Sequence, residues 1–512
     1  MNPALPRRWQ AAILGAAAFS SLCKIDLALN TFGTNDVYAW ERFARWSGLF
    51  GSRLYAIDPA FNHPPSMIHA LALLTWLAKT TGVFFPFWLR LPAILADLGS
   101  LWVLSRIFQE RLAEPVVRWG LLLFALSPAL ILISGFHGNT DSVVMFFLLL
   151  AVWRGERDAQ SGALFGAAMC VKILPIVVLP VFFFARRDWR RRIVFLASAA
   201  VVIVIGWSPY LFRNAADIYR QVFGYSSIYG HWGLTWLAAW HMPFFRDSWH
   251  DACQRWGAYG SLAIITAAAW MVNRKADRPP VYTQAGAALS FFLAASNGFG
   301  VHYLAWLVPW TIGISLISVG FFTLASGAFL LAVYNFWAGG FPWFLADSNY
   351  VGDFVPHLDY LLTLCWISVI ALACAVWRRR PAMPSRGTVL AAATFAIPLI
   401  AWPLWNQVVR IDHRRYPAAD DHAALSSIHA GEYAMLSEAY YKMGRYIDAV
   451  AAARTGVSLD PAVSEAWTRI ALACIPLGRW DEALTAATTA VRLAPDDQTA
   501  NAALAELQSR RY

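Results

Sequence analysis

Four ionisable residues stand at the borders of long hydrocarbon stretches, where a charge is costly to keep without a role. Asp36 follows the first apolar run, Asp141 lies in GFHGNTDSVV, Lys172 lies in VKILP, and His302 lies in NGFGVHYLAW. A carboxylate can take the proton of an attacking hydroxyl, while lysine and histidine can hold a departing phosphate. The four residue types could therefore provide acid–base chemistry together with anion binding.

The surroundings of these residues are those of a polytopic membrane protein. Of the 512 residues, 58% are hydrophobic and 14% are charged, and apolar runs recur as far as about residue 405. We expect an all-α fold with about thirteen transmembrane helices, using the criterion of ~20 apolar residues. The expected spans cover residues 10–30, 86–106, 116–135, 141–153, 161–173, 174–185, 193–212, 256–272, 282–298, 301–317, 319–337, 359–377 and 388–405. The short pair around Lys172 and Pro175 suggests helices that stop partway and line a cavity.

The arginine-rich connections indicate which side of the membrane is cytoplasmic. They fall on a single side if residues 66–82 form an amphipathic helix on the outer surface instead of a span. The N-terminus is then cytoplasmic, and the four ionisable residues gather at the outer face. Because this orientation explains the net charge of +10, the charge gives no reason to expect nucleic-acid binding.

The end of the chain changes character and repeats with a period of 34 residues. AYYKMGRYIDA at 439–449 matches ACIPLGRWDEA at 473–483, and LDP at 459–461 matches LAP at 493–495. This register is typical of tetratricopeptide repeats, in which paired helices stack through alanines and turn at a glycine. We therefore expect a membrane domain at 1–405, a linker at 406–430 and a repeat domain at 431–512.

Two further features of the sequence bear on processing and metals. The six cysteines are scattered, and no pair has the spacing of a metal site, so neither a disulfide framework nor a zinc site is expected. The N-terminal Arg-Arg and the apolar run after it lack a small-x-small cleavage site, so the first span is expected to stay uncleaved.

The order of the motifs resembles the GT-C membrane glycosyltransferases, which transfer sugars from polyprenyl-phosphate donors. The resemblance rests on an acid at the start of a long first outer loop, a His-Pro-Pro element, a second-loop acid, a Lys-x-x-Pro between short helices and a late His-Tyr-Leu. GNTDS followed by VKILP looks most like the enzyme that adds the first mannose to the GPI anchor, and like its bacterial relatives. The family's first loop often carries paired acids, whereas this chain has Asn35-Asp36.

The resemblance implies a role for each outer residue. Asp36 is expected to be the catalytic base, and Asp141 a second catalytic acid that binds sugar or acceptor hydroxyls or shares the base role. Lys172, assisted by His302, is expected to bind the donor phosphate as a point charge. The remaining substrate-binding residues are expected to be His63, His137, Asn139 and Tyr303. No metal-ligating set is predicted, but the unpaired first-loop acid leaves the use of a divalent metal ion open.

Each residue also has a purely structural interpretation. Asp36 could cap a helix or pair with Arg42, and Asp141 could be the N-cap of the helix that follows it. Lys172 could extend its ammonium to the membrane interface, and His302 could be an ordinary interfacial histidine.

Other classes of membrane protein share part of this pattern. A lipid-linked oligosaccharide ligase or polymerase of the O-antigen type also has many spans, but it relies on arginines and a histidine in a late loop, whereas the acids here are early. A lipid-linked sugar transporter or flippase is expected to show internal repeats and charges near the bilayer midplane, and the sequence shows neither. A scaffold anchored for its repeats has no need of polar groups converging on one face.

Substrates and location follow from the same resemblance. It implies a polyprenyl-phosphate-linked sugar, with mannose favoured, that reaches the enzyme from the membrane lipid. The repeats either recruit a protein or envelope-glycan acceptor or only pack on the core. Exported repeats and the lack of a eukaryotic retention signal favour a bacterial inner membrane, with the active site facing the periplasm.

Overall fold

The computed structural model is predominantly helical and divides into two compact units, residues 1–411 and 412–512. It describes residues 5–108, 114–225, 232, 233, 235, 246–296, 298–340, 342–347, 356–375 and 421–509. The expected all-α fold is confirmed. In the described residues the strand pairing is limited to β1 (Gly33–Thr34) and β2 (Leu345–Ala346), which lie parallel.

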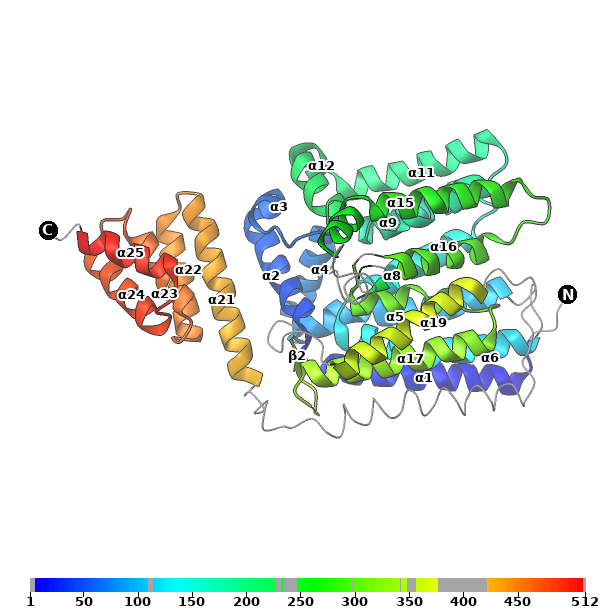
Figure 1. Ribbon diagram of the computed structural model, residues 1–512, viewed down its shortest axis with the longest axis horizontal. Coiled ribbons are helices and arrows are strands. Elements are labelled where there is room, and N and C mark those ends of the chain that lie inside the picture. The colour runs from blue at the N-terminus through cyan, green and yellow to red at the C-terminus, as the bar shows by residue number, and fades with distance from the viewer. Residues whose placement is uncertain are drawn as a thin grey trace. The chain divides into compact units, whose positions relative to one another are not determined.

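The first unit is a bundle of long helices with short elements at one end. Its helices are α1 (Arg7–Asn30), α2 (Asn35–Phe50), α3 (Leu54–Ile57), α4 (Ser66–Thr81), α5 (Phe85–Phe108), α6 (Glu114–Ala125), α7 (Pro128–Leu132), α8 (Asp141–Trp153), α9 (Asp158–Val171), α10 (Leu179–Ala185), α11 (Trp189–Trp207), α12 (Tyr210–Arg213), α13 (Ala215–Ile218), α15 (Arg246–Arg274), α16 (Val281–Ala295), α17 (Leu316–Trp337) and α19 (Pro356–Ala375). The short helical turns are η1 (Gly51–Arg53), η2 (Ile133–His137), η3 (Leu174–Val178), η4 (Tyr219–Phe223), η6 (Val301–Trp306) and η7 (Val308–Trp310). The long helices run side by side, and α2, α3 and α4 gather at one end of them (Figure 1).

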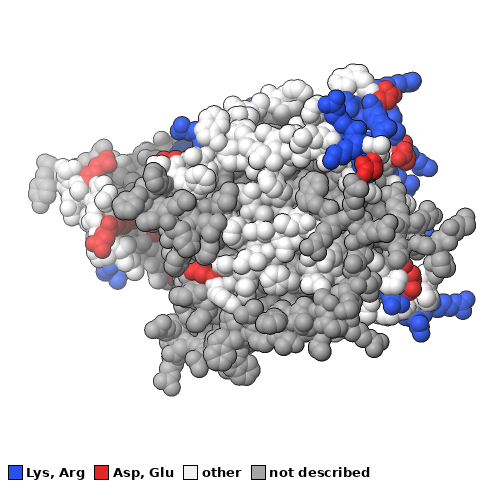
Figure 2. All heavy atoms as spheres, turned by 45° about the vertical axis from the view of Figure 1, so that its right-hand side comes forward, with Lys and Arg blue, Asp and Glu red and all other residues white. Residues whose placement is uncertain are grey.

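The outer surface of this unit is apolar, as a lipid-facing surface must be. Large hydrophobic side chains of α1 point outward, with Leu14, Phe19 and Leu22 exposed by 68%, 60% and 66%. Figure 2 shows a surface that is mostly uncharged along the helices, with Lys, Arg, Asp and Glu gathered toward the ends. The first unit therefore has the surface of a membrane protein.

Five helices in the described residues are long and apolar enough to cross a membrane: Arg7–Asn30, Phe85–Phe108, Glu114–His137, Leu316–Trp337 and Leu358–Ala375. Shorter apolar helices lie at Asp141–Trp153, Leu174–Ala185 and Val281–Ala295. The expected number of about thirteen spans is not confirmed, and the span expected at 388–405 lies outside the described residues. The predicted break near Lys172 is present, because α9 ends at Val171 and the 3-10 turn η3 begins at Leu174.

The expected span at residues 301–317 is wrong. This segment forms the two short 3-10 turns η6 and η7. Pro309 has no backbone N–H to continue a helical ladder, and Gly313 adopts a φ of +87° that a helix does not use. The segment is buried inside the bundle instead, so its high hydrophobicity reflects core packing and not contact with lipid.

The second unit consists of antiparallel helix pairs. Its helices are α21 (Asp421–Lys442), α22 (Tyr446–Leu459), α23 (Ser464–Cys474), α24 (Trp480–Leu493) and α25 (Gln498–Ser509). Gly444 and Gly478, which stand 34 residues apart in the repeat, have φ values of +72° and +71° at the turns within successive pairs. The core between the helices is built largely from alanines such as Ala449, Ala471 and Ala483, which let the helix axes approach closely.

Candidate active site

Asp36 lies where α1, the β1–β2 pairing and α2 meet. α1 ends at Asn30, β1 pairs with β2, and α2 begins at Asn35, so Asp36 falls in the first turn of α2. The N-terminus of a helix favours a negative charge at this position. The Asp36 side chain is 34% exposed, which leaves the carboxylate within reach of a substrate.

The structure excludes both structural interpretations of Asp36. The N-cap of α2 is Thr34, and no side-chain hydrogen bond caps this helix. Arg42 forms its ion pair with Asp58 instead, with Nε of Arg42 2.8 Å from Oδ2 of Asp58. Asp58, which also lies in the segment between α1 and α4, therefore has Arg42 as its partner.

His137 and Asn139 contact Asp36 from the connection before α8. His137 ends the π-helical turn η2, and its Nε2 lies 3.0 Å from Oδ2 of Asp36. The amide nitrogen of Asn139 donates to the same oxygen at 3.3 Å. Nδ1 of His137 lies 2.9 Å from the hydroxyl of Tyr334 in α17. If this hydroxyl donates to Nδ1, the neutral imidazole keeps its proton on Nε2 and donates it to Asp36.

Asp141 is fully buried and is held by two donors. Nζ of Lys172 lies 2.7 Å from Oδ1 of Asp141, and Nε1 of Trp306 donates to the same oxygen at 2.6 Å. The N-cap of α8 is Thr140, so the interpretation of Asp141 as a helix cap is wrong. The second oxygen, Oδ2, is buried and accepts no hydrogen bond from the described residues.

His302 stands between the two carboxylates. Its Nδ1 lies 3.9 Å from Oδ2 of Asp36, and its Nε2 lies 3.8 Å from Oδ2 of Asp141. The His302 ring also packs against the His137 ring, with centroids 4.8 Å apart. The imidazole of His302 is thus positioned to exchange a proton or a hydrogen bond with either acid after a small shift.

Tyr303 forms part of the wall around the ammonium of Lys172. The rings of Tyr303 and Trp306 stack with centroids 4.0 Å apart. Nζ of Lys172 lies 5.3 Å from the centroid of Tyr303 and 5.6 Å from that of Trp306, which are cation–π distances. Lys172 therefore points inward to these aromatic rings, so the interpretation of an ammonium extended to the membrane interface is wrong.

His63 lies in an aromatic cluster beside these residues. Its ring stacks on Trp40 with centroids 4.1 Å apart, and Phe43 and Phe61 flank it. The hydroxyl of Tyr55 donates to its carbonyl oxygen at 2.6 Å. Within the described residues no hydrogen bond joins the His63 ring to the polar cluster, so His63 shapes the wall and stays outside the hydrogen-bond network.

The charge state of the two first-loop residues follows from their neighbours. Burial tends to raise the pKa of Asp36, but the electrostatic attraction and hydrogen bond of His137, together with the nearby His302 and Lys172, outweigh burial and hold this pKa below the usual range. Burial and the positive charge of Lys172 lower the pKa of His63 to about 3. Asp36 is thus ionised and His63 is neutral at physiological pH.

The same cluster contains donor atoms that suit a metal ion. One ligand atom from each of Asp36, His137 and His302 falls within 4.8 Å of the others. Two imidazoles and a carboxylate match the preferences of Mn²⁺, Fe²⁺ or Zn²⁺ more than those of Mg²⁺. Such an ion would replace the hydrogen bond between His137 and Asp36, and Nδ1 of His137 would then carry the ring proton and donate it to Tyr334.

Arg90 in α5 supports the segment that presents Asp36. It is fully buried, and its Nη1 donates to the carbonyl oxygen of Thr31 at 3.0 Å while its Nη2 donates to that of Phe32. A Cβ on Gly33 would overlap this guanidinium, and one on Gly138 would lie 3.5 Å from its Nε. Arg90 therefore sits between the turn before Asp36 and the turn after His137.

The structure thus brings together six of the eight predicted residues, namely Asp36, His137, Asn139, Asp141, Lys172 and His302, and places Tyr303 and His63 in the wall around them. Sequence reasoning missed Trp306, Tyr334 and Arg90. Trp306 follows His302 in the same motif, and an arginine inside an apolar span is itself a signal of function or support. Tyr334 lies in an apolar helix and carries no comparable signal.

Two family models match parts of the chain. Residues 61–297 match the model of glycosyltransferase family 87, and residues 433–463 and 464–497 match that of the tetratricopeptide repeat. No curated protein and no solved structure matches the chain. The protein is a membrane glycosyltransferase of the GT-C type with C-terminal tetratricopeptide repeats. Within the membrane region, residues 61–297 are similar to glycosyltransferase family 87.

The matched region does not contain the whole site. It includes His137, Asp141 and Lys172, but Asp36 precedes it and His302 follows it. These two residues join the site through the distances given above.

Proposed function

We infer that this glycosyltransferase moves a sugar from a polyprenyl-phosphate donor to an acceptor hydroxyl with inversion at the anomeric carbon. Asp36 takes the proton of the acceptor hydroxyl as its oxygen attacks the anomeric carbon. The bond between that carbon and the phosphate oxygen breaks, and its electron pair leaves with the polyprenyl phosphate. The products are the glycosylated acceptor, the lipid phosphate and a protonated Asp36.

The observation that carries this proposal is the contrast between the two acids. Asp36 is partly exposed and ionised, so a hydroxyl can approach it, whereas Asp141 is fully buried and tied to Lys172 and Trp306. A base must reach its proton, so Asp36 is the better base. Asp141 orients the Lys172 ammonium and offers its free oxygen, Oδ2, to a donor hydroxyl or to His302.

Lys172 and His302 are the proposed phosphate-binding groups. The Lys172 side chain is 17% exposed and that of His302 is 14% exposed, so both border the open side of the cluster. A positive charge near the departing phosphate stabilises the charge that develops in the transition state. Arrival of the anionic donor would also offset the cations that depress the pKa of Asp36, which makes this carboxylate a stronger base in the complex.

The finer assignments rest on the motif resemblance. We propose mannose as the sugar, and a cell-envelope component or protein as the acceptor. The active site and repeats would face the periplasm of a bacterium, and the repeats would recruit the acceptor. A chain that ends near residue 415 tests the role of the repeats. If it transfers sugar to the native acceptor as fast as the full chain does, the repeats do not recruit the acceptor.

A transfer assay tests the proposal. The full chain, purified in detergent, is incubated with radiolabelled polyprenyl-phosphate sugars and membrane-derived acceptors, alongside Asp36→Asn and the control Asp217→Asn. Asp217 lies in α13 and pairs with Arg220 at 3.8 Å, outside the cluster. Transfer that is lost in Asp36→Asn and kept in Asp217→Asn supports the mechanism. Activity retained in Asp36→Asn excludes Asp36 as the base, and inactivity with every donor favours the ligase or flippase alternatives.

A further inference from the structure

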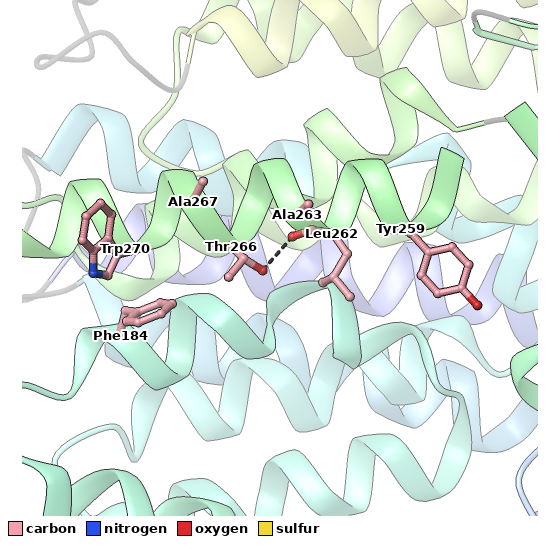
Figure 3. A pocket seen from close by; sticks show the side chains of 7 residues that line it. All are labelled: Phe184, Tyr259, Leu262, Ala263, Thr266, Ala267 and Trp270. Atoms are coloured by element: carbon pink, nitrogen blue, oxygen red, sulfur yellow. Dashed lines mark hydrogen bonds between the residues drawn. The ribbon is translucent and has the colours of Figure 1, made fainter. Parts of the chain in front are cut away.

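An apolar groove lies on the side of the membrane unit, away from the candidate active site. It holds about 550 Å³ and is lined by Phe184 of α10 and by Tyr259, Leu262, Ala263, Thr266, Ala267 and Trp270 of α15. Figure 3 shows Phe184 facing the row of α15 side chains across the groove. The Thr266 hydroxyl donates to the carbonyl oxygen of Leu262 at 2.7 Å, so it is already satisfied within the helix. The groove therefore suits a hydrocarbon chain.

Two arginines stand at one end of this groove. The guanidinium carbon of Arg274 lies 4.6 Å from the ring centroid of Trp270, and that of Arg192 lies 5.7 Å from the centroid of Phe184. Trp270 and Phe184 both line the groove, so these distances place two positive charges beside its end.

The end with the arginines has the features of a membrane interface. Segments 154–158, 186–192 and 274–278 carry ten Arg or Lys and four Asp or Glu residues. Figure 2 shows Lys and Arg gathered at this end of the helices. Trp189 and Trp270 are exposed there, and exposed tryptophans favour the headgroup level of a bilayer. The two groove arginines are thus at the depth of lipid headgroups.

Two of the four acids at this end, Asp158 and Glu156, pair with other arginines. Asp158 pairs with Arg186 at 2.8 Å and with Arg191 at 2.7 Å, and Glu156 pairs with Arg191 at 3.3 Å. Within the described part of the chain, neither Arg192 nor Arg274 forms an ion pair. Arg192 uses its Nε to donate to the carbonyl oxygen of Arg186 at 2.8 Å, which leaves its terminal nitrogens for another acceptor.

We propose that the groove is a binding site for an anionic phospholipid of the surrounding membrane. An acyl chain lies along α15 between Phe184 and Tyr259, and the phosphate accepts hydrogen bonds from Arg192 and Arg274. Basic pockets between transmembrane helices recognise anionic headgroups by this combination of charge and hydrocarbon contact. The occupant is distinct from the donor lipid, because the donor phosphate is proposed to bind at Lys172, and no site residue lines the groove.

Lipid retention measured by native mass spectrometry tests this proposal on the full chain. The protein is equilibrated with phosphatidylglycerol or phosphatidylcholine in detergent micelles, and the lipids that remain bound are counted. Arg192→Gln/Arg274→Gln removes the two groove charges. The matched control, Arg190→Gln/Lys275→Gln, removes two exposed charges from the same end that do not contact a groove-lining ring.

A second pair of variants tests the hydrocarbon part. Ala267→Leu fills the groove without a change in charge, and Ala197→Leu adds the same group to an exposed position of α11. Size-exclusion profiles and circular dichroism check that each variant is folded.

The expected result is selective retention of phosphatidylglycerol by the wild type. Binding should fall roughly 30-fold in Arg192→Gln/Arg274→Gln, because the two cations near an anionic headgroup together contribute about 2 kcal/mol and 1.4 kcal/mol corresponds to a factor of ten. Ala267→Leu should also lose the lipid, while both controls retain it. The proposal is overturned if the control Arg190→Gln/Lys275→Gln loses as much phosphatidylglycerol as Arg192→Gln/Arg274→Gln does. It is also overturned if the wild type retains phosphatidylcholine equally well, or if Ala267→Leu retains all of its phosphatidylglycerol. Displacement of phosphatidylglycerol by polyprenyl phosphate would assign the groove to the donor chain instead.

Discussion

The ammonium of Lys172 lies 2.7 Å from Oδ1 of Asp141, so the cation proposed to hold the donor phosphate is already paired with a buried carboxylate. A phosphate that binds here must share the ammonium with Asp141. The pairing fixes where the charge points, at the cost of weakening its attraction for a second anion.

This relationship predicts opposite effects on binding and turnover in Asp141→Asn. The neutral amide no longer repels a phosphate, so the KM for the donor should stay equal or fall. The kcat should fall by roughly 10- to 100-fold, because a misplaced charge stabilises the transition state less well. Steady-state kinetics with varied donor concentration separate the two constants. A raised KM with normal kcat would show that Asp141 serves donor binding alone.

The pH dependence of transfer should report the low pKa of Asp36. In the free enzyme the Asp36 carboxyl stays ionised until the pH falls below about 4, the ordinary pKa of an aspartate. Titration of Asp36 should therefore cause no change in kcat/KM between pH 8 and 5. In the donor complex the phosphate offsets the nearby cations, so the acid limb of kcat should lie at higher pH than that of kcat/KM.

Substitution of Asp36 measures how much the proposed general base contributes to kcat. Loss of a general base costs roughly 10²- to 10⁴-fold in rate, so Asp36→Asn should lose this much of kcat, while Asp36→Glu keeps a carboxylate and part of the activity. Burial lowers the pKa of His302 to about 3, so a limb of kcat/KM well above pH 5 that persists in Asp36→Glu would show that neither Asp36 nor His302 sets it.

Arg90 should behave as a positioning residue. Arg90→Met removes hydrogen bonds to the turn before Asp36, and bonds from a charged donor contribute about 1.5–3 kcal/mol each. We expect a lower melting temperature and a lower kcat with an unchanged KM for the donor, and partial rescue by Arg90→Lys. Arg106→Met in the last turn of the same helix is the control, because Arg106 is exposed and its guanidinium packs over the Trp102 ring, away from Asp36. If Arg90→Met has a lower melting temperature but a normal kcat, Arg90 contributes to stability only and does not position Asp36.

Gly138 offers a steric test of the coupling between the two acid-bearing loops. Its φ is +80°, and a Cβ there would meet Cγ2 of Val37 at 2.5 Å, next to Asp36. Gly138→Ala should therefore push the first turn of α2 and lower kcat by at least tenfold. Gly82→Ala is the control because Gly82 has a φ of +71° but open space around its Cβ position.

Both alanine variants should lose about 1 kcal/mol of stability from the unfavourable φ. Thermal unfolding checks this shared cost, and the transfer assay checks the difference. Equal activity in both variants would show that the Asp36 turn tolerates the added methyl group.

The helical breaks near the site illustrate how far sequence reasoning reaches. The interruption at Lys172 was predictable, because Pro175 limits the helix on a local scale. The segment at 301–317 was not, because a buried apolar run and a lipid-facing run have the same composition, and only packing distinguishes them. For the same reason the number of spans depends on tertiary contacts that hydropathy does not record.

The sequence alone determined the membrane class, the tetratricopeptide repeats and the four ionisable residues at span borders, because composition, period and the cost of an intramembrane charge are local properties. Only the tertiary structure decided which partners those residues have. In the structure Asp141 contacts Lys172 and Trp306, and Asp36 contacts His137 and Asn139. His302 lies between the two acids. These contacts join residues more than 30 positions apart, and distances between distant segments follow from how the helices pack and not from the spacing of residues along the chain.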